Sequence, residues 1–196
     1  MKYSMSPRIY GIFYHMVCKK RLDKKTAKAV MAEYKAVIGR AKDIGNSRLL
    51  NSYCMCAYFI ALCRENKVDP QANYEILSGG LDESRIFHAM LGNAESYLDP
   101  KKMPGRLQWS RDSHKRTYDN DWVVDVLPGN GEYDLGYDYL ECGDCKLCRD
   151  EGCPELTHYL CDMDYMLTDM MGLDLKRTQT LSEGGCCCDF RYYRRK

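Results

Sequence analysis

The chain has 196 residues and a mass of 22.7 kDa, which is the size of one domain. Hydrophobic residues make up 45% and charged residues 29%, a balance that excludes a disordered chain. Lys and Arg (29) nearly balance Asp and Glu (28), so the charge gives no support to a nucleic-acid or membrane-surface partner. No apolar run reaches the roughly 18 residues of a transmembrane helix, and residues 1–20 lack the apolar segment of a secretory signal. We therefore expect one cytoplasmic domain.

The first part of that domain, residues 1–98, is expected to be mainly helical. Apolar residues recur every three or four positions in residues 22–41, in 49–61 and, more briefly, from about residue 82 to 91. This period predicts three amphipathic helices. Asp69-Pro70 predicts the end of the second helix. Residues 99–120 are polar and contain two prolines, so we expect a long loop there with one edge strand.

The second part, residues 99–196, changes to the period of strands. Residues 122–127 are short and rich in valine, the turn residues 128–131 follow, and apolar and polar residues then alternate to residue 139, which predicts a hairpin. Pro154 and Gly172 have the positions expected at the start and the end of a helix. Residues 173–181 and 186–193 predict two more strands. The order β-β-α-β-β predicts an α+β fold, with the helical half packed on an antiparallel sheet of four or more strands.

Twelve cysteines are the unusual feature of the composition, and eight of them follow residue 141. The spacing Cys142-x2-Cys145-x2-Cys148-x4-Cys153 is close to that of ferredoxin ligands, and four thiolates also suit zinc. One interpretation is therefore a zinc ion or an iron–sulfur cluster at these four residues. The other is that the cysteines begin a helix and simply pack in its core.

The predicted helix that follows carries polar residues opposite its apolar stripe. Cys161 and Asp162 lie on this polar side. The side either faces solvent, as we expect for Asp164 and Asp169, or lines a pocket. In a pocket, Cys161 could be a nucleophile with Asp162 as its polar partner.

The two C-terminal strands place further reactive groups. Arg177 shares a strand face with apolar residues, and a buried guanidinium requires an anion, either a protein carboxylate or a ligand carboxylate. On the last strand, Cys188 shares the face of Phe190, so it is either a core residue or part of a site. Asp189 and Arg191 lie on the opposite face, where they could form an ion pair.

A series of short segments also carries a family resemblance. These are Asp121-Trp122, Asp134-Leu135-Gly136, Glu141-Cys142, Pro154-Glu155-Leu156, Leu160-Cys161-x2-Asp164-Tyr165 and Arg177-Thr178-Gln179-Thr180-Leu181-x-Glu183-Gly184-Gly185-x2-Cys188-Asp189-Phe190-Arg191. Over about residues 100–193 the chain resembles the L-2-amino-thiazoline-4-carboxylic acid hydrolase family, most specifically in the last segment. The same tail is also similar to the 4-vinyl reductase domain, a small-molecule-binding α+β fold.

The resemblance implies a hydrolase that opens a small cyclic amidine, such as 2-amino-thiazoline-4-carboxylate, to an N-carbamoyl amino acid. This chemistry needs a nucleophile or base, an acid group for the amidine and a cation for the carboxylate. The candidate nucleophiles are Cys161 and Cys188. The candidates for holding the amidine are Asp162, Glu183 and Asp189, with Thr180 as a hydrogen-bond donor. Arg177 suits the carboxylate because its planar fork matches two oxygens.

A second class of function stays open on the sequence alone. The twelve cysteines and their ferredoxin-like spacing also favour a non-catalytic module that binds a small ligand or a metal, as a sensor does. In either class we expect a small-molecule substrate or ligand and neither nucleic acid nor membrane as a partner. A homo-oligomer is compatible with both.

Overall fold

The computed structural model describes residues 7–45 and 47–195, so the first six residues of the segment inspected for a secretory signal lie outside the described part. The N-terminal half is helical, as predicted. Its helices are α1 (Pro7–Cys18), η1 (Lys19–Arg21), α2 (Lys24–Arg40), α3 (Leu50–Glu65), α4 (Pro70–Asp82), α5 (Arg85–Leu91) and α6 (Ala94–Tyr97). In the described part of the chain, no helix is both long enough and apolar enough to cross a bilayer.

The sequence analysis missed α1 and α4 and misread the role of Asp69-Pro70. Helix α3 already ends at Glu65, and Asp69-Pro70 starts the next helix instead of ending the previous one. The carboxylate of Asp69 accepts a hydrogen bond from the amide of Ala72 (2.9 Å), which caps α4. Pro70 fills the first helical position, where its missing N–H costs no intrahelical bond.

The expected loop over residues 99–120 was also wrong, because this segment contains η2 (Pro100–Lys102) and α7 (Met103–Ser113). Both prolines, Pro100 and Pro104, lie in the first turn of a helix, the place where proline is compatible with one. Leu107 and Trp109 of α7 pack against the sheet. The helix is mostly polar because only this narrow side of it is covered.

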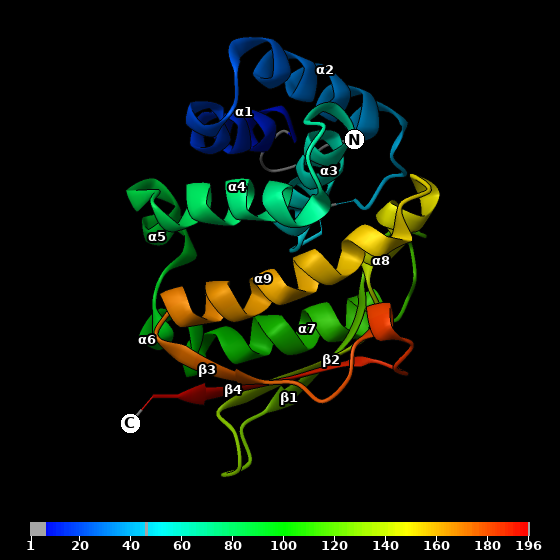
Figure 1. The fold of residues 1–196 in the computed structure, drawn as a ribbon. Helices are drawn as coiled ribbons and strands as arrows, with labels where there is room; N and C mark the ends of the chain where they lie inside the picture. The colour runs from blue at the N-terminus through cyan, green and yellow to red at the C-terminus, as the bar shows by residue number, and fades with distance from the viewer. Residues whose placement is uncertain (1–6, 46, 196) are drawn as a thin grey trace.

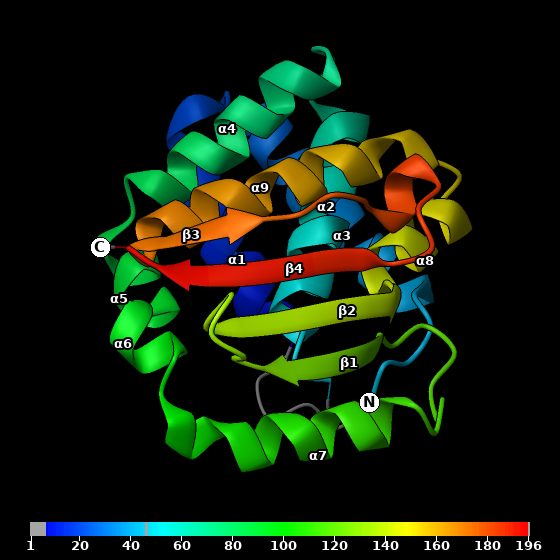
Figure 2. The same ribbon diagram turned by 90° about the horizontal axis from the view of Figure 1, so that it is seen from below.

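A four-stranded antiparallel sheet forms the C-terminal half and confirms the α+β fold (Figure 2). The strands are β1 (Val123–Pro128), β2 (Leu135–Glu141), β3 (Leu173–Lys176) and β4 (Cys188–Arg194), in the spatial order β1-β2-β4-β3. The helices between β2 and β3 are α8 (Gly143–Asp150), η3 (Pro154–Leu156) and α9 (Thr157–Met170). Strand β3 is shorter than the predicted 173–181, because the chain leaves the sheet after Lys176 and forms η4 (Leu181–Glu183).

The helices cover one face of the sheet, with α9 beside β3 and α7 beside β1 (Figures 1 and 2). Two clusters of buried side chains result. The helical cluster joins α1, α2, α3, α4, α8 and α9 around large residues such as Tyr14, Tyr58 and Phe59. The sheet cluster joins the inner face of the strands to the α5–α7 region through residues such as Tyr137 and Phe190.

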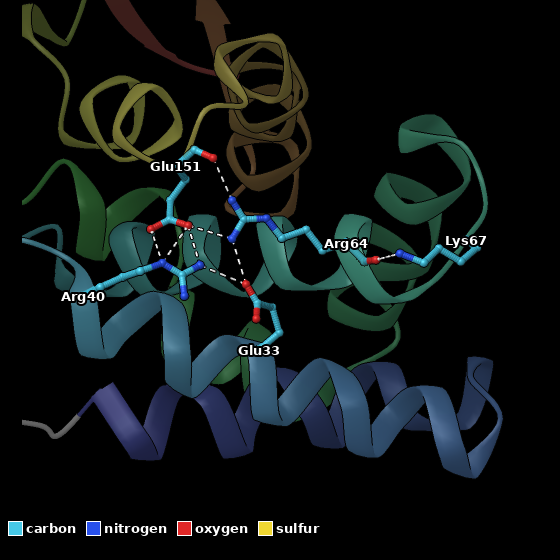
Figure 3. Close-up of polar contacts among 5 residues, drawn as sticks. All are labelled: Glu33, Arg40, Arg64, Lys67 and Glu151. Carbon is cyan, nitrogen blue, oxygen red and sulfur yellow. Dashed lines mark hydrogen bonds and ion pairs between the residues drawn. The ribbon is translucent and has the colours of Figure 1, made fainter.

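A charge network fixes α8 against α2 and α3 (Figure 3). Glu151, directly after α8, accepts hydrogen bonds from Arg40 (2.6 Å) and Arg64 (2.7 Å), and its side chain is only 6% exposed. Glu33 of α2 bonds to the same two guanidinium groups. Lys67 also donates to the backbone carbonyl of Arg64. The network therefore holds the C-terminal end of α8 in place, and with it the direction in which this helix presents its side chains.

Candidate active site

A cavity of about 290 Å³ lies where the two buried clusters meet. Met55 and Leu160 contribute to its wall from the helical cluster, and Phe190 and Tyr192 contribute from the sheet cluster. Apart from the tyrosine hydroxyls and the indole of Trp122, the polar groups of its wall belong to Arg48, Asn51, Ser52, Cys142, Asp144, Thr157, Cys161, Asp164, Thr168, Arg177 and Cys188. A mostly apolar cavity with a few convergent polar groups is typical of a small-molecule site.

Two carboxyl groups line this cavity, and both have strongly raised pKa values. Burial raises the pKa of Asp144, in the first turn of α8, to about 7 even though the hydroxyl of Ser52 donates to Oδ2 (2.6 Å). Its other oxygen, Oδ1, is buried and has no hydrogen-bond partner among the described residues. Burial likewise raises the pKa of Asp164 on α9 to about 7, and the charge of Asp144 adds to the effect. Near neutral pH both groups can therefore give or take a proton.

The protein carboxylate that Arg177 requires is Asp164. Nη1 of Arg177 lies 3.0 Å from Oδ2 of Asp164, and Nη2 donates to the carbonyl of Cys161 (3.2 Å). The guanidinium also lies over the rings of Tyr165 and Phe190, with centroid distances of 5.0 and 5.1 Å. This pairing lowers the pKa of Asp164 against the effect of burial. The Arg177 side chain is 5% exposed and Asp164 keeps 34%, so the carboxylate is the more accessible member of the pair.

Three thiols share the cavity wall, namely those of Cys142, Cys161 and Cys188. Burial raises the pKa of Cys161 to about 12, although the hydroxyl of Ser182 lies 3.3 Å from its sulfur. Burial also raises the pKa of Cys188 to about 11, and its sulfur accepts a hydrogen bond from the amide of Leu181. The thiolate is the nucleophilic form of cysteine, so protonated thiols of this kind are weak nucleophiles at neutral pH.

Four of the residues predicted to be catalytic or substrate-binding lie outside the cavity wall, and three of these organise the chain around it. Thr180 caps η4 and also donates to the carboxylate of Glu183 (2.7 Å), a capping arrangement at the start of this short helix. Asp189 accepts hydrogen bonds from the backbone of residues 178 and 179 and from the hydroxyl of Thr178. The expected Asp189–Arg191 pair does not form, because Arg191 bonds to Asp138 on the neighbouring strand (2.7 Å).

The fourth is Asp162, which is exposed on α9. Its neighbour Asp164, which the sequence analysis placed toward solvent, lines the cavity instead. The two positions are about 200° apart on a helix, so one faces the site when the other faces away. That expectation for Asp164 was wrong, because the polar side of α9 meets the sheet and not only solvent.

The four cysteines of the predicted metal cluster lie in two pairs, with Cys142 hydrogen-bonded to Cys145 and Cys148 to Cys153. Cys142 lines the cavity, whereas the sulfur of Cys148 lies 3.5 Å from that of Cys56 on α3. Within residues 7–45 and 47–195, no group of three or more His, Cys, Asp or Glu side chains is arranged to hold a metal ion. This arrangement does not fit a tetrathiolate site. Metal binding stays a prediction, which metal analysis of the purified protein would test.

Neither carboxyl group of the cavity wall, Asp144 or Asp164, was predicted from the sequence as a site residue. Asp144 lies within the stretch that was predicted to bind a metal, and nothing in its spacing marks it as a site residue. Asp164 was part of the segment Leu160-Cys161-x2-Asp164-Tyr165, the one signal that could have selected it over Asp162. Arg48 and Ser52 come from the helical half, where periodicity indicated only core packing.

The fold and the cavity together define an α+β protein with a mostly apolar cavity whose wall includes two carboxyl groups. The sequence model of the family described as L-2-amino-thiazoline-4-carboxylic acid hydrolase matches residues 47–192. The chain belongs to this family, and the match supports a hydrolase-type function. It begins near α3, well before the expected residue 100, so the family includes part of the helical half. No curated protein and no solved structure matches the chain.

Proposed function

We propose that the protein hydrolyses a small cyclic amidine, such as 2-amino-thiazoline-4-carboxylate, and opens its ring to an N-carbamoyl amino acid. The observation that carries this proposal is the pair of cavity carboxyl groups, Asp144 and Asp164, whose pKa values both lie at about 7. Addition of water to an amidine carbon requires one group that removes a proton and another that supplies one. Two acids with pKa values near neutral pH in one cavity meet this need without a thiolate.

The environments of the two carboxyl groups suggest their roles. Asp164 is paired with Arg177, which favours its ionised form, so we assign it as the base. The carboxyl group of Asp144 accepts a hydrogen bond from the hydroxyl of Ser52, and no cation of the described chain forms an ion pair with it, so we assign it as the acid.

The proposed reaction has two steps in which atoms and charges balance. A water oxygen bonds to the amidine carbon while Asp164 takes a proton from that water and Asp144 gives its proton to the ring nitrogen. The carbon–sulfur bond then breaks, the new hydroxyl gives its proton to Asp144, and the leaving sulfur takes the proton from Asp164. The carbonyl of the carbamoyl group forms, the thiol is released, and both carboxyl groups return to their starting states.

Arg177 has two possible contributions that experiment can separate. The structure favours a positioning role, in which the guanidinium orients Asp164 and lowers its pKa. The alternative is the carboxylate clamp implied by the family resemblance. The thiols of Cys161 and Cys188 line the same space and would contribute shape and polarity.

The test is to incubate the purified protein with 2-amino-thiazoline-4-carboxylate and to follow, by mass spectrometry, a product heavier by one water. In ¹⁸O-labelled water the carbamoyl group should carry the label. Asp144→Asn and Asp164→Asn should each lower kcat by about 100-fold or more, the usual effect of losing a general acid or base. Asp162→Asn changes a neighbouring carboxylate that is exposed, so it should leave kcat almost unchanged.

Two outcomes would overturn the proposal. One is that no cyclic amidine is hydrolysed. The other is that both cavity variants keep full activity while Asp162→Asn loses it. Saturable binding of the compound without turnover would favour the alternative of a non-catalytic ligand-binding module.

A further inference from the structure

A second groove, of about 390 Å³, lies next to the cavity and shares Arg48, Leu49, Tyr97 and Tyr139 with it. Four cationic side chains line this groove. They are Arg48 from the segment before α3, Lys101 and Lys102 from η2, and Arg106 from α7. No acidic residue of the described chain lines it. The groove therefore concentrates positive charge in a protein whose net charge is only +1.

The buried member of this set is Arg106, which is 7% exposed. Its guanidinium donates to the backbone carbonyl of Tyr97 and lies over the ring of the same residue, 5.3 Å from the centroid. Among residues 7–45 and 47–195, no carboxylate forms an ion pair with it. Burial of a cation without an anion is unfavourable, and a ring face offsets that cost only in part. The missing negative charge is the first indication of an anionic ligand.

A buried donor without a partner, on a residue of the groove wall, is the second indication. Trp109 lines the groove, and its Nε1 is buried with no hydrogen-bond partner in the described part of the chain. Indole N–H is a donor only, so it requires an acceptor such as a carboxylate or phosphate oxygen. The indole packs edge-on against Tyr137 and Tyr139, and the guanidinium carbon of Arg48 lies 6.0 Å from its centroid.

We propose that this groove binds a small molecule that has a flat ring or π system and carries a carboxylate or phosphate group. The oxyanion would lie among Arg48, Lys101 and Arg106 and accept the hydrogen bond of Trp109, while the flat part rests on the aromatic wall. Because Arg48 also lines the cavity, the bound anion lies at the border of the two sites. The proposal does not depend on cyclic amidine hydrolysis.

Phenyl phosphate is the probe, with benzoate as the carboxylate form and benzamide as the uncharged control. Isothermal titration calorimetry of the full chain should show saturable binding of both oxyanions, weakened by added salt, and no binding of benzamide. The double variant Arg48→Gln/Lys101→Gln should bind about tenfold or more weakly, since two charge-assisted contacts are lost. Both side chains are exposed, so the fold should be retained, which circular dichroism would verify.

Two further variants make the result specific. Trp109→Phe keeps the ring and removes the N–H, so it should weaken binding by a few fold. Arg111→Gln removes an exposed cation of the same helix that does not line the groove, and it should leave the affinity unchanged. Absence of saturable binding, or equal loss in Arg111→Gln and in the double variant, would overturn the proposal.

A competition experiment identifies the source of the anion. If 2-amino-thiazoline-4-carboxylate displaces phenyl phosphate, the groove holds the carboxylate of the cavity's own substrate. If it does not, the groove serves a separate anionic ligand. A protein that binds phenyl phosphate but hydrolyses no cyclic amidine would keep this inference and refute only the proposed function.

Discussion

Replacing Asp144 by asparagine should stabilise the protein at neutral and alkaline pH. The carboxyl group is 7% exposed, and its pKa rises from an ordinary 3.8 to about 7 on folding. The folded state therefore binds more protons than the unfolded state between these values, and the free energy of unfolding falls as pH rises through them. The difference of roughly 3 pKa units corresponds to about 4 kcal/mol once the pH exceeds 7.

Asparagine keeps the shape and cannot ionise, so the variant avoids this loss. The stability gain of Asp144→Asn over the wild type should be about 2 kcal/mol at about pH 5 and about 4 kcal/mol at about pH 8. Urea unfolding at several pH values, followed by circular dichroism, measures the two curves. Asp162→Asn is the matched control, because it makes the same substitution at an exposed position outside the cavity.

Parallel curves for wild type and Asp144→Asn would refute the reasoning, since they would show that Asp144 ionises equally easily in the folded and unfolded states. A stable but inactive variant would indicate that the buried carboxylate is kept for function at the expense of stability.

Three other changes test the packing and the site. Gly80→Ala should destabilise the protein by about 1–3 kcal/mol, because a Cβ there would meet a backbone carbonyl oxygen of α1 at 2.8 Å. Gly39→Ala places its Cβ where no atom lies within 4 Å, so it should stabilise the protein by about 0.5–1 kcal/mol. Thermal unfolding of both variants measures the two effects. Glu151→Gln should cost about 2 kcal/mol in urea unfolding at neutral pH, because two guanidinium groups lose a nearly buried anion (Figure 3), and a change below about 0.5 kcal/mol would contradict this. Arg177→Gln should raise the pKa of Asp164 and move the lower limb of the pH–kcat profile to higher pH, whereas an unchanged profile with a raised KM would favour the carboxylate clamp.

Much of the fold could be predicted from the sequence because the signals are local. Apolar periodicity located α2, α3 and the hairpin, and Pro154 and Gly172 marked the start and end of the helical segment that contains α9. The errors also have local causes. Asp69-Pro70 was read as the end of a helix although it begins one, and the mostly polar α7 has too narrow an apolar side to show a helical period.

The site depended on information that is not local. The C-terminal motif of the sequence was sufficient to indicate the hydrolase family, and it selected Cys161, Cys188 and Arg177, which do line the cavity. The helical period of 3.6 residues shows that two residues lie on different sides of a helix. It does not show which of these sides faces the sheet across the cavity. That choice, Asp164 over Asp162, follows from how α9 packs on β3 and η4. The raised pKa values of Asp144 and Asp164 likewise arise only when segments distant in the sequence pack around the two carboxyl groups, so the tertiary structure alone decides which acids line the cavity.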